Sequence, residues 1–277
     1  MESEVKIAIQ GNRGSFHHVV AKAYNGDHDL VCCETFDATV QALINGSAQQ
    51  AVMAIENSIA GSIIPNYALI DQHNLKIIGE YNLGIQHELM ALPGQQLSEL
   101  KEVHSHPMAL LQCKEFFKQY PQIRLVEAED TADEARRIFE NQLLRTGAIA
   151  SSEAASLYGM EILASSIQTI KNNITRFVIL QTQNPQIEES KIDKAALKFI
   201  LDHQRGSLAA VLNVMSDCQL NLTKIQSLPV IETPGKYAFF VDITFDDYAH
   251  YDKAKQLISI MASSFKILGE YTQFKKI

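Results

Sequence analysis

The pattern of apolar residues changes near residue 181, and this change limits the folds that the chain can adopt. Before it, short apolar runs alternate with amphipathic stretches, which is typical of α/β architecture. Residues 183–193 are polar, contain Pro185 and show no apolar period, which indicates a linker. The length of 277 residues fits about two domains. The sequence therefore predicts an α/β region at 1–182 and a second domain at 194–277.

The first region shows strand and helix patterns in succession. The run at 51–55 is apolar at every position, as in a strand buried on both faces. Pro107 suits the first turn of a helix, and Asp130 or Thr131 can cap the next helix. The sequence predicts helices that start near 16, 107, 131 and 152, and strands at 5–9, 51–55, 75–79, 85–91, 102–105, 124–128, 147–150 and 176–180.

The second region contains one pattern twice. Apolar residues within 208–215 follow the i, i+3, i+4, i+7 spacing of a helix face, and the same spacing recurs within 254–261. Alternation along 237–243 predicts a sheet with one buried face. Strand patterns flank both helices, at 197–201, 220–230, 237–243 and 265–274. This order predicts the ferredoxin-like βαββαβ plan.

Charge and hydropathy exclude several protein classes. The chain has 24 Lys and Arg against 32 Asp and Glu, so 24 − 32 = −8 with His neutral. Such a chain is not expected to bind nucleic acid or anionic lipid over its whole surface. No apolar run approaches the roughly 18 residues of a membrane span, and residues 1–6 lack the features of a signal peptide. We expect a cytoplasmic protein with no nucleic-acid or membrane partner.

The four cysteines favour the same compartment. Cys32 and Cys33 are adjacent, Cys113 and Cys218 are isolated, and no CxxC or Cys/His ligand spacing is present. A disulfide framework is unusual in a chain of this size, so we predict buried free thiols in a reducing environment. The sequence predicts no metal site.

Two polar segments stand beside apolar strand patterns, at positions where α/β sheets bind ligands. In 56–62, small residues let backbone N–H groups approach an anion, and Asn57, Ser58 and Ser62 supply neutral hydrogen bonds. The alternative is an ordinary capped helix start. In 172–177, Arg176 stands at the start of an apolar strand. Its guanidinium suits either a carboxylate ligand or a protein carboxylate.

A third polar segment, His104 to Pro107, has two histidines near a helix start. Either histidine is a candidate for a titrating catalytic group, but a packed or capping residue is the commoner role. The glycines at 11 and 14 lack the spacing of a P-loop or of GxGxxG, so they give little support to nucleotide binding.

Together these segments resemble prephenate dehydratase, a family of phenylalanine synthesis, with a C-terminal ACT regulatory domain. The resemblance covers nearly the whole chain and rests on 55–62 (IENSIAGS), 105–113 (SHPMALLQC) and 173–177 (NITRF). It implies a catalytic region of two α/β lobes around a cleft, similar to a periplasmic binding protein.

The resemblance also implies a reaction, catalysed by a carbon–oxygen lyase without cofactor or metal. Prephenate loses carbon dioxide and its ring hydroxyl to give phenylpyruvate. In this family pattern Thr175 donates to the departing hydroxyl, Arg176 orders a carboxylate, and Phe177 packs at the cleft. The implied substrate-binding residues are Glu56, Asn57, Ser58, Gly61, Ser62 and His106. Glu56 repels a dianion unless it is protonated or paired elsewhere.

The ACT resemblance implies L-phenylalanine as an allosteric effector at the interface of a homodimer or homotetramer. Gln226 and Leu228 replace the Glu and Arg of the family's Glu-Ser-Arg-Pro motif, which removes one charge of each sign. Either the affinity for the effector changes, or the two losses compensate each other, because both partners of a charge pair are neutralised together. The implied effector residues are Gly206, Ser207, Leu208, Ala209, Gln226, Ser227, Leu228 and Pro229.

Two alternative functions stay open. Arogenate dehydratase catalyses the same elimination on a substrate with an amino group in place of the keto group. A noncatalytic amino-acid sensor is the other alternative, and the intact motif at 175–177 argues against it. We do not expect a fused chorismate mutase, because the strand pattern begins at Val5.

Overall fold

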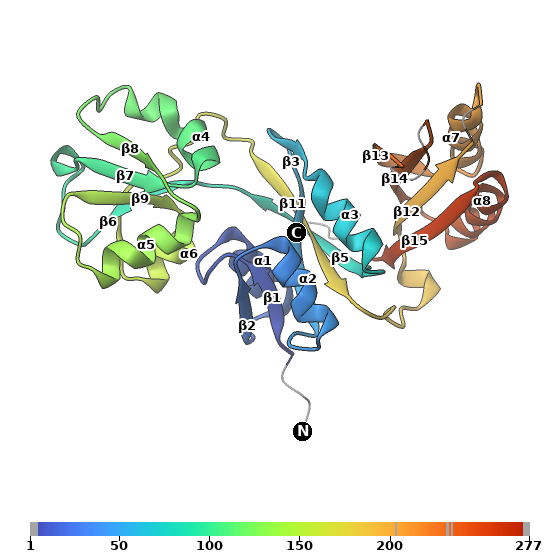
Figure 1. The fold of residues 1–277 in the computed structure, drawn as a ribbon, viewed down its shortest axis with the longest axis horizontal. Helices are drawn as coiled ribbons and strands as arrows, with labels where there is room; N and C mark the ends of the chain where they lie inside the picture. The colour runs from blue at the N-terminus through green and yellow to red at the C-terminus, as the bar shows by residue number, and fades with distance from the viewer. Residues whose placement is uncertain (1–4, 203, 231–232, 234, 274–277) are drawn as a thin grey trace. The chain divides into compact units, whose positions relative to one another are not determined.

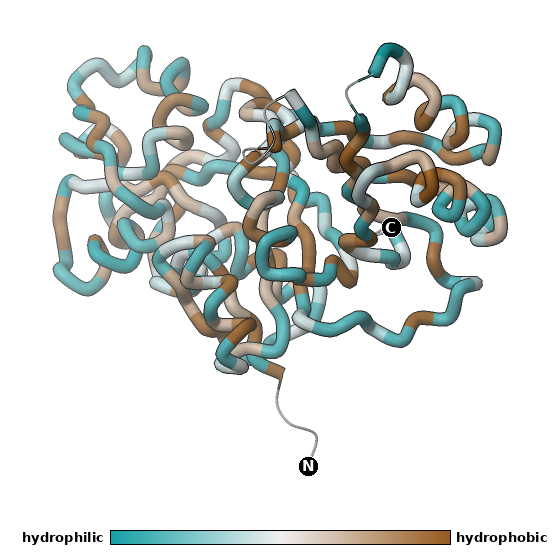
Figure 2. The backbone as a smooth tube through the Cα atoms, turned by 45° about the vertical axis from the view of Figure 1, so that its right-hand side comes forward, coloured by the Kyte–Doolittle hydropathy of each residue, from teal (hydrophilic) through white to brown (hydrophobic). Residues whose placement is uncertain are grey.

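The computed structural model describes residues 5–202, 204–230, 233 and 235–273. It divides into two compact units. The first unit comprises Met1–Ile63 and Tyr81–Phe177, and the second comprises Ile64–Glu80 and Val178–Ile277. Along the chain, hydrophobic stretches alternate with hydrophilic ones (Figure 2).

The first sheet has the strand order β2-β1-β3-β11-β5 (Figure 1). A short β4 pairs with β3. β1 lies parallel to both β2 and β3. Ala51 to Ile55 are all buried, which confirms the prediction of a strand covered on both faces. The strands are β1 (Ile7–Gln10), β2 (Leu30–Cys33), β3 (Gln50–Asn57), β4 (Gly61–Ser62), β5 (Lys76–Gly84) and β11 (Ile174–Gln181), and the helices are α1 (Phe16–Asn25) and α2 (Phe36–Ile44).

The second sheet has the order β10-β6-β9-β7-β8, and β7 lies parallel to β8 and β9. Two apolar clusters form around it, one with α4 and the other with α5 and α6. The two sheets with their helices form the two α/β lobes that the sequence predicted. The elements are β6 (Glu88–Ala91), β7 (Glu102–Ser105), β8 (Arg124–Glu127), β9 (Thr146–Ala150), β10 (Glu161–Ala164), α4 (Pro107–Phe117), α5 (Thr131–Glu140) and α6 (Ser152–Leu157).

Capping residues fix the starts of the helices in this lobe. Pro107 occupies the first turn of α4 after His106, as predicted. The Asp130 carboxylate accepts hydrogen bonds from the backbone N–H groups of Ala132 at 2.8 Å and Asp133 at 2.9 Å. Asp130 rather than Thr131 is therefore the cap of α5, and it satisfies two N–H groups that have no partner within the helix.

The third sheet belongs to the second unit and has the order β13-β14-β12-β15, antiparallel throughout. The element order β12-α7-β13-β14-α8-β15 is the predicted βαββαβ plan. Phe274, the end of the last predicted strand, lies outside the described residues. The elements are β12 (Lys194–Leu201), α7 (Ser207–Asp217), β13 (Asn221–Pro229), β14 (Tyr237–Thr244), α8 (Tyr248–Met261) and β15 (Ser264–Tyr271).

The prediction that this sheet has one buried face is wrong. Val241 and Ile243 face the cluster formed with α7 and α8, but Phe240 and Asp242 on the opposite face are also buried. The reason is α3 (Ile64–Gln72), a helix that the sequence did not predict. The Tyr67 ring of α3 lies 5.5 Å from the Phe240 ring, edge to face.

Ion pairs hold the same helix to the sheet. Asp71 of α3 pairs with Lys198 of β12 and, at 2.7 Å, with Lys266 of β15. Burial alone raises the pKa of Asp71, but its hydrogen bonds and charge interactions with the two lysines outweigh this and lower the pKa. The second unit is therefore a three-layer arrangement, with α3 on one face of the sheet and α7 and α8 on the other.

Gly269 of β15 permits a close backbone approach within the second unit. A Cβ at Gly269 would lie 2.1 Å from the Ile77 carbonyl oxygen and 2.7 Å from the Ile77 Cβ. We expect Gly269→Ala to lower the free energy of unfolding by about 3 kcal/mol, because backbone must shift to admit the methyl group. Gly84→Ala is the matched control, since nothing lies within 4 Å of its Cβ. Equal urea midpoints for the two variants would contradict this packing.

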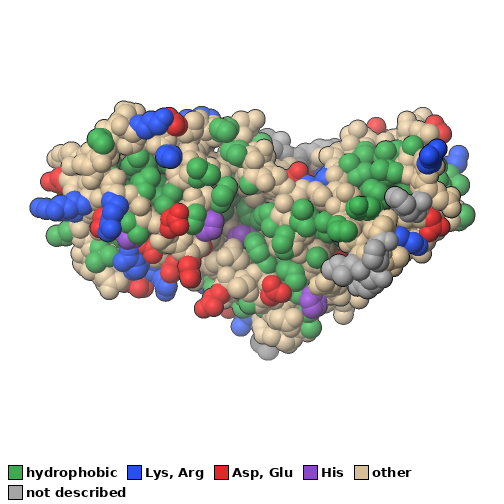
Figure 3. Space-filling view, turned by 45° about the horizontal axis from the view of Figure 1, so that its top comes forward, with side chains coloured by type: hydrophobic (Ala, Val, Ile, Leu, Met, Phe, Trp, Pro, Cys, Tyr) green, Lys and Arg blue, Asp and Glu red, His purple; other side chains and the backbone are tan. Residues whose placement is uncertain are grey.

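The surface and the thiols refine the expectations from composition. In the described residues, no helix is long and apolar enough to cross a membrane. On the face shown in Figure 3, basic and acidic side chains are interspersed. All four cysteines are free; Cys113 and Cys218 are buried as predicted, and burial raises the pKa of Cys113 to about 12. Cys32 is exposed, which corrects the prediction for that residue.

Candidate active site

Asn57, at the end of β3, has an amide whose orientation is fixed by the backbone. Its Oδ1 accepts hydrogen bonds from the N–H groups of Ile59 and Ala60, both at 2.9 Å. A backbone N–H can only donate, so the oxygen must face these groups. The Asn57 Nδ2 therefore points the other way, toward β11.

Thr175 of β11 receives that amide group. The Asn57 Nδ2 donates to the Thr175 Oγ1 at 2.8 Å, and Thr175 is 8% exposed. This contact uses a lone pair of the hydroxyl oxygen, so the hydroxyl proton can be donated to another group. The first and third sequence motifs thus meet in one directed hydrogen bond.

The second motif joins the same network through Asn173 and Gln112. The other Asn57 Nδ2 proton goes to the Asn173 Oδ1 at 2.7 Å. The Asn173 Nδ2 donates in turn to the Gln112 Oε1 of α4 at 3.0 Å, and the His87 Nε2 lies 2.8 Å from that oxygen. Gln112 and Asn173 lie within the sequence motifs but were not predicted to belong to the site, and His87 was not predicted at all.

The remaining residues of 56–62 build a hairpin against β11. The Ser58 N–H donates to the Ile174 carbonyl at 2.8 Å, and the Ser58 Oγ accepts from the Ile174 N–H at 2.9 Å. Gly61 has φ +82°, which favours glycine, and β4 pairs Gly61 with Asn57 and Ser62 with Glu56. Ser58 therefore holds β11 beside the segment, and Gly61 makes its turn possible.

Arg176 and Glu56 form an ion pair. Their nearest nitrogen and oxygen atoms are 3.8 Å apart, with the guanidinium 10% exposed and the carboxylate 37% exposed. This is the protein-carboxylate alternative of the sequence analysis. It also places a positive charge next to Glu56, the carboxylate expected to repel an anion.

Phe177 lies in the core of the first unit and is 1% exposed. Its ring meets that of His17 edge to face, with 5.0 Å between centroids. The His17 Nε2 accepts a hydrogen bond from the Ala54 N–H at 3.3 Å, and burial lowers the pKa of His17 to about 4. His17 is therefore neutral, and Phe177 supports β3 and β11 from within the core.

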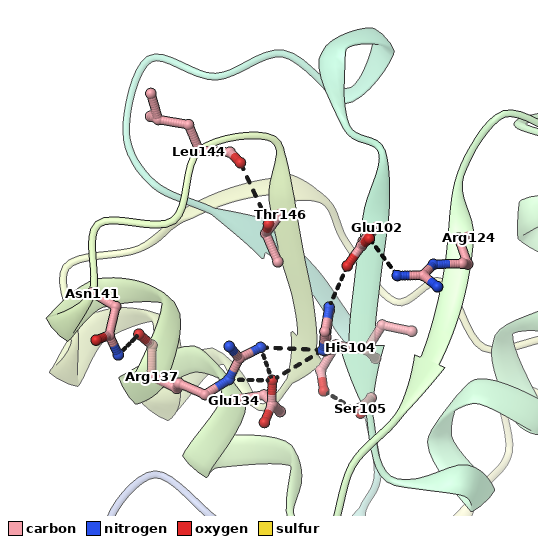
Figure 4. Close-up of polar contacts among 10 residues, drawn as sticks. Glu102, His104, Ser105, Arg124, Glu134, Arg137, Asn141, Leu144 and Thr146 are labelled. Carbon is pink, nitrogen blue, oxygen red and sulfur yellow. Dashed lines mark hydrogen bonds and ion pairs between the residues drawn. The ribbon is translucent and has the colours of Figure 1, made fainter.

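The histidines of the third polar segment have structural contacts. The His106 Nδ1 accepts from the Met108 N–H at 3.2 Å and caps α4. His104 lies between Glu102, at 3.0 Å, and Glu134, at 3.4 Å (Figure 4). Hydrogen bonds from His104 and Arg124 hold the pKa of Glu102 below its usual range. The capping and packing alternatives fit both histidines.

The candidate effector residues lie at one end of the third sheet. Gly206, with φ +82°, caps α7, and Ser207 to Ala209 form its first turn. Pro229 pairs with Tyr237 of β14, and Leu201, at the end of β12, pairs with Tyr237 from the other side. The first motif therefore follows the end of β12 and the second forms the end of β13, on either side of the start of β14; Leu228 pairs with Ala238. The Gln226 amide donates to the Ser227 carbonyl at 3.0 Å.

Metal binding has no support in the part of the chain that the structure describes. Those residues contain no group of three or more His, Cys, Asp or Glu side chains that could hold a metal ion. The candidate site instead consists of amides, hydroxyls and one ion pair.

Comparisons with known proteins agree with the motifs. The prephenate dehydratase family model matches residues 7–185. Arogenate dehydratase/prephenate dehydratase 2 of Arabidopsis thaliana is 34% identical over 97% of this chain and 73% of its own length. The prephenate dehydratase of Arthrobacter aurescens in complex with L-Phe is 25% identical, with a TM-score of 0.86 over 97% of this chain and 90% of that one. GqqA, described as a novel type of quorum-quenching acylase, is 27% identical, with a TM-score of 0.87 over 97% of this chain and 98% of that one.

The family model spans more than half of the chain, and the Arabidopsis relative is similar over nearly all of it. The three motifs lie within the matched residues, and they meet in one hydrogen-bonded network around Asn57 and Thr175. On this evidence, the chain belongs to the prephenate dehydratase family.

Proposed function

We propose that the protein converts prephenate into phenylpyruvate as a carbon–oxygen lyase, at a site centred on Thr175. The observation that carries this proposal is the orientation of the Thr175 hydroxyl, whose oxygen accepts from the Asn57 Nδ2 at 2.8 Å. A hydroxyl held in this way has its proton free for a substrate oxygen.

The reaction does not require a covalent intermediate between substrate and protein. As the ring carboxylate leaves as carbon dioxide, the electrons of its C–C bond enter the ring. The ring C–O bond breaks with its electron pair on oxygen, and the hydroxyl takes a proton and departs as water. Aromatisation drives these steps, so the site mainly has to bind the dianion and stabilise the departing oxygen.

Thr175 acts by hydrogen bonding to that oxygen. A threonine hydroxyl is a weak acid, so the proton that completes the water comes ultimately from solvent. Arg176 contributes positive charge and is ordered by Glu56, 3.8 Å away. Asn57 orients Thr175 and Ser58 holds the segment to β11, and we assign Gly61 and Ser62, which pair with Asn57 and Glu56 in the hairpin, to substrate binding.

Acyl transfer is less well supported by the same geometry. A threonine nucleophile needs a neighbouring group that accepts its proton. The partner that the structure gives Thr175 is an amide nitrogen that donates to it. We therefore favour the elimination over the activity described for GqqA.

We also propose that residues 194–277 form an ACT domain that binds L-phenylalanine and lowers turnover, in a cytoplasmic homodimer or homotetramer. Support comes from the βαββαβ order, from the Arthrobacter relative solved with L-Phe, and from the convergence of the two effector motifs at one sheet end. The boundaries 1–182, 183–193 and 194–277 are part of this proposal.

The substrate is tested by supplying prephenate and arogenate to the purified protein in parallel. We expect a higher kcat/KM with prephenate, measured as phenylpyruvate by its absorbance in alkali. A preference for arogenate, measured as phenylalanine, would assign the alternative dehydratase. A folded sample that is inactive on both would favour the sensor alternative.

The effector is tested by calorimetric titration with L-phenylalanine. We expect saturable binding below millimolar concentration, weakened at least tenfold by Gly206→Val, because φ +82° at that position disfavours a side chain and Val would displace the start of α7. Gly84→Val, outside the second unit, is the matched control. Absence of binding at millimolar L-phenylalanine would contradict the regulatory role.

A further inference from the structure

His87 stands at the far end of the hydrogen-bonded network that reaches Thr175. It directly precedes β6 and is 4% exposed. Its backbone is fixed on both sides, because its N–H donates to the Gln168 Oε1 at 2.9 Å and its carbonyl accepts from the Ile167 N–H at 2.9 Å. The ring meets Phe16 edge to face at 5.6 Å between centroids.

The donor and the acceptor of every hydrogen bond in this network follow from the orientation of the Asn57 amide. Two backbone N–H groups fix the Asn57 oxygen, so the Asn57 nitrogen must donate to Asn173. The oxygen of Asn173 is thereby used as an acceptor, and its nitrogen must donate to the Gln112 Oε1. Gln112 thus presents an oxygen to the His87 Nε2, 2.8 Å away.

The tautomer of His87 is determined by that oxygen. An amide oxygen can only accept, so the His87 Nε2 must carry a hydrogen. The His87 Nδ1 is buried and has no hydrogen-bond partner in the described residues. A buried polar atom without a partner costs free energy, and it is retained where another requirement fixes the side chain.

We propose that His87 is a positioning residue for the elimination: its Nε2–H holds Gln112, which through Asn173 supports the position of the Asn57 amide and hence of the Thr175 hydroxyl. This inference rests on the proposed function of Thr175. Burial lowers the pKa of His87, and its hydrogen bond to Gln112 offsets only part of that effect. The ring is therefore neutral near pH 7, and its unprotonated Nδ1 has no role in binding Gln112.

Two variants separate the hydrogen bond from the volume of the ring. His87→Phe keeps an aromatic ring beside Phe16 but removes the donor, and we expect kcat to fall about 10- to 100-fold with KM little changed. His87→Gln can place an amide N–H near the former Nε2 position, and we expect it to restore most of kcat. Urea midpoints of both variants monitor folding.

The tautomer gives a second test that does not depend on turnover. In protein labelled with ¹⁵N-histidine, we expect the His87 signals, assigned by their loss in His87→Gln, to show a protonated Nε2 and an unprotonated Nδ1 at pH 7. The opposite tautomer, or an unchanged kcat in folded His87→Phe, would overturn the inference. If the wild-type protein turned over neither prephenate nor arogenate, the proposed function would be wrong. The measured tautomer of His87 would then still show whether the hydrogen-bonded network from Asn57 to His87 is correct.

Discussion

Replacing Thr175 with alanine is expected to lower kcat for prephenate by about 10²- to 10³-fold, the usual effect of removing one hydrogen-bond donor from a developing charge. The variant removes the hydroxyl that the Asn57 Nδ2 orients at 2.8 Å. The fold should persist, because alanine fits within the space that threonine occupies and the neighbouring backbone bonds remain. The measurement is the steady-state rate of phenylpyruvate formation.

Thr175→Ser is the matched control for this prediction. Serine keeps the oxygen that accepts from Asn57 and the proton that is donated to substrate, so we expect a loss of less than about tenfold in kcat. If Thr175→Ala were as active as the wild type while remaining folded, Thr175 would not act on the departing hydroxyl. The candidate site would then have to be placed elsewhere.

Replacing Glu80 with alanine is expected to lower the free energy of unfolding by about 3–5 kcal/mol, because it leaves a buried lysine without its partner. Glu80 is 0% exposed, and the Lys194 Nζ lies 2.8 Å from both of its carboxylate oxygens. The Tyr271 hydroxyl donates to the same carboxylate at 3.4 Å. The midpoint of urea unfolding measures the loss.

Two control experiments test whether the loss of stability arises from the burial of this ion pair or would follow from breaking any ion pair. The double variant Glu80→Leu with Lys194→Met removes both charges, and we expect it to recover most of the lost stability. Asp202→Ala breaks an exposed pair, in which the Asp202 carboxylate is 62% exposed and contacts Lys236, and it should cost less than about 1 kcal/mol. Similar losses for Glu80→Ala and Asp202→Ala would show that Glu80 is not isolated from solvent.

The sequence predicts most strands and helices because their apolar residues follow clear periods. The helix α3, Ile64–Gln72, is the instructive failure. It has a proline at its second position and apolar residues around much of its circumference, so it shows no helical period. Because α3 was not predicted, the alternation along 237–243 was interpreted as a sheet with one face exposed to solvent. That face is buried because Tyr67 and Asp71 of α3 pack on it, which no local pattern could show.

The candidate site was also predicted only in part. Asn57 stood out because polar residues follow an apolar strand there, and Thr175 stood out within the 173–177 motif at the start of another strand; the structure joins them directly. Gln112 lies within a helix and His87 in a short connection, so neither has a local signal of a binding role. Their place in the network depends on contacts between segments 25 to 61 residues apart in sequence.

The central claim is tested most directly by the initial rate of phenylpyruvate formation from prephenate near neutral pH, compared with a tube that lacks protein. We predict a saturable rate far above the spontaneous one with wild-type protein, retained by Thr175→Ser and lost in Thr175→Ala. A wild-type rate equal to the spontaneous rate, from a sample shown to be folded, would contradict the account.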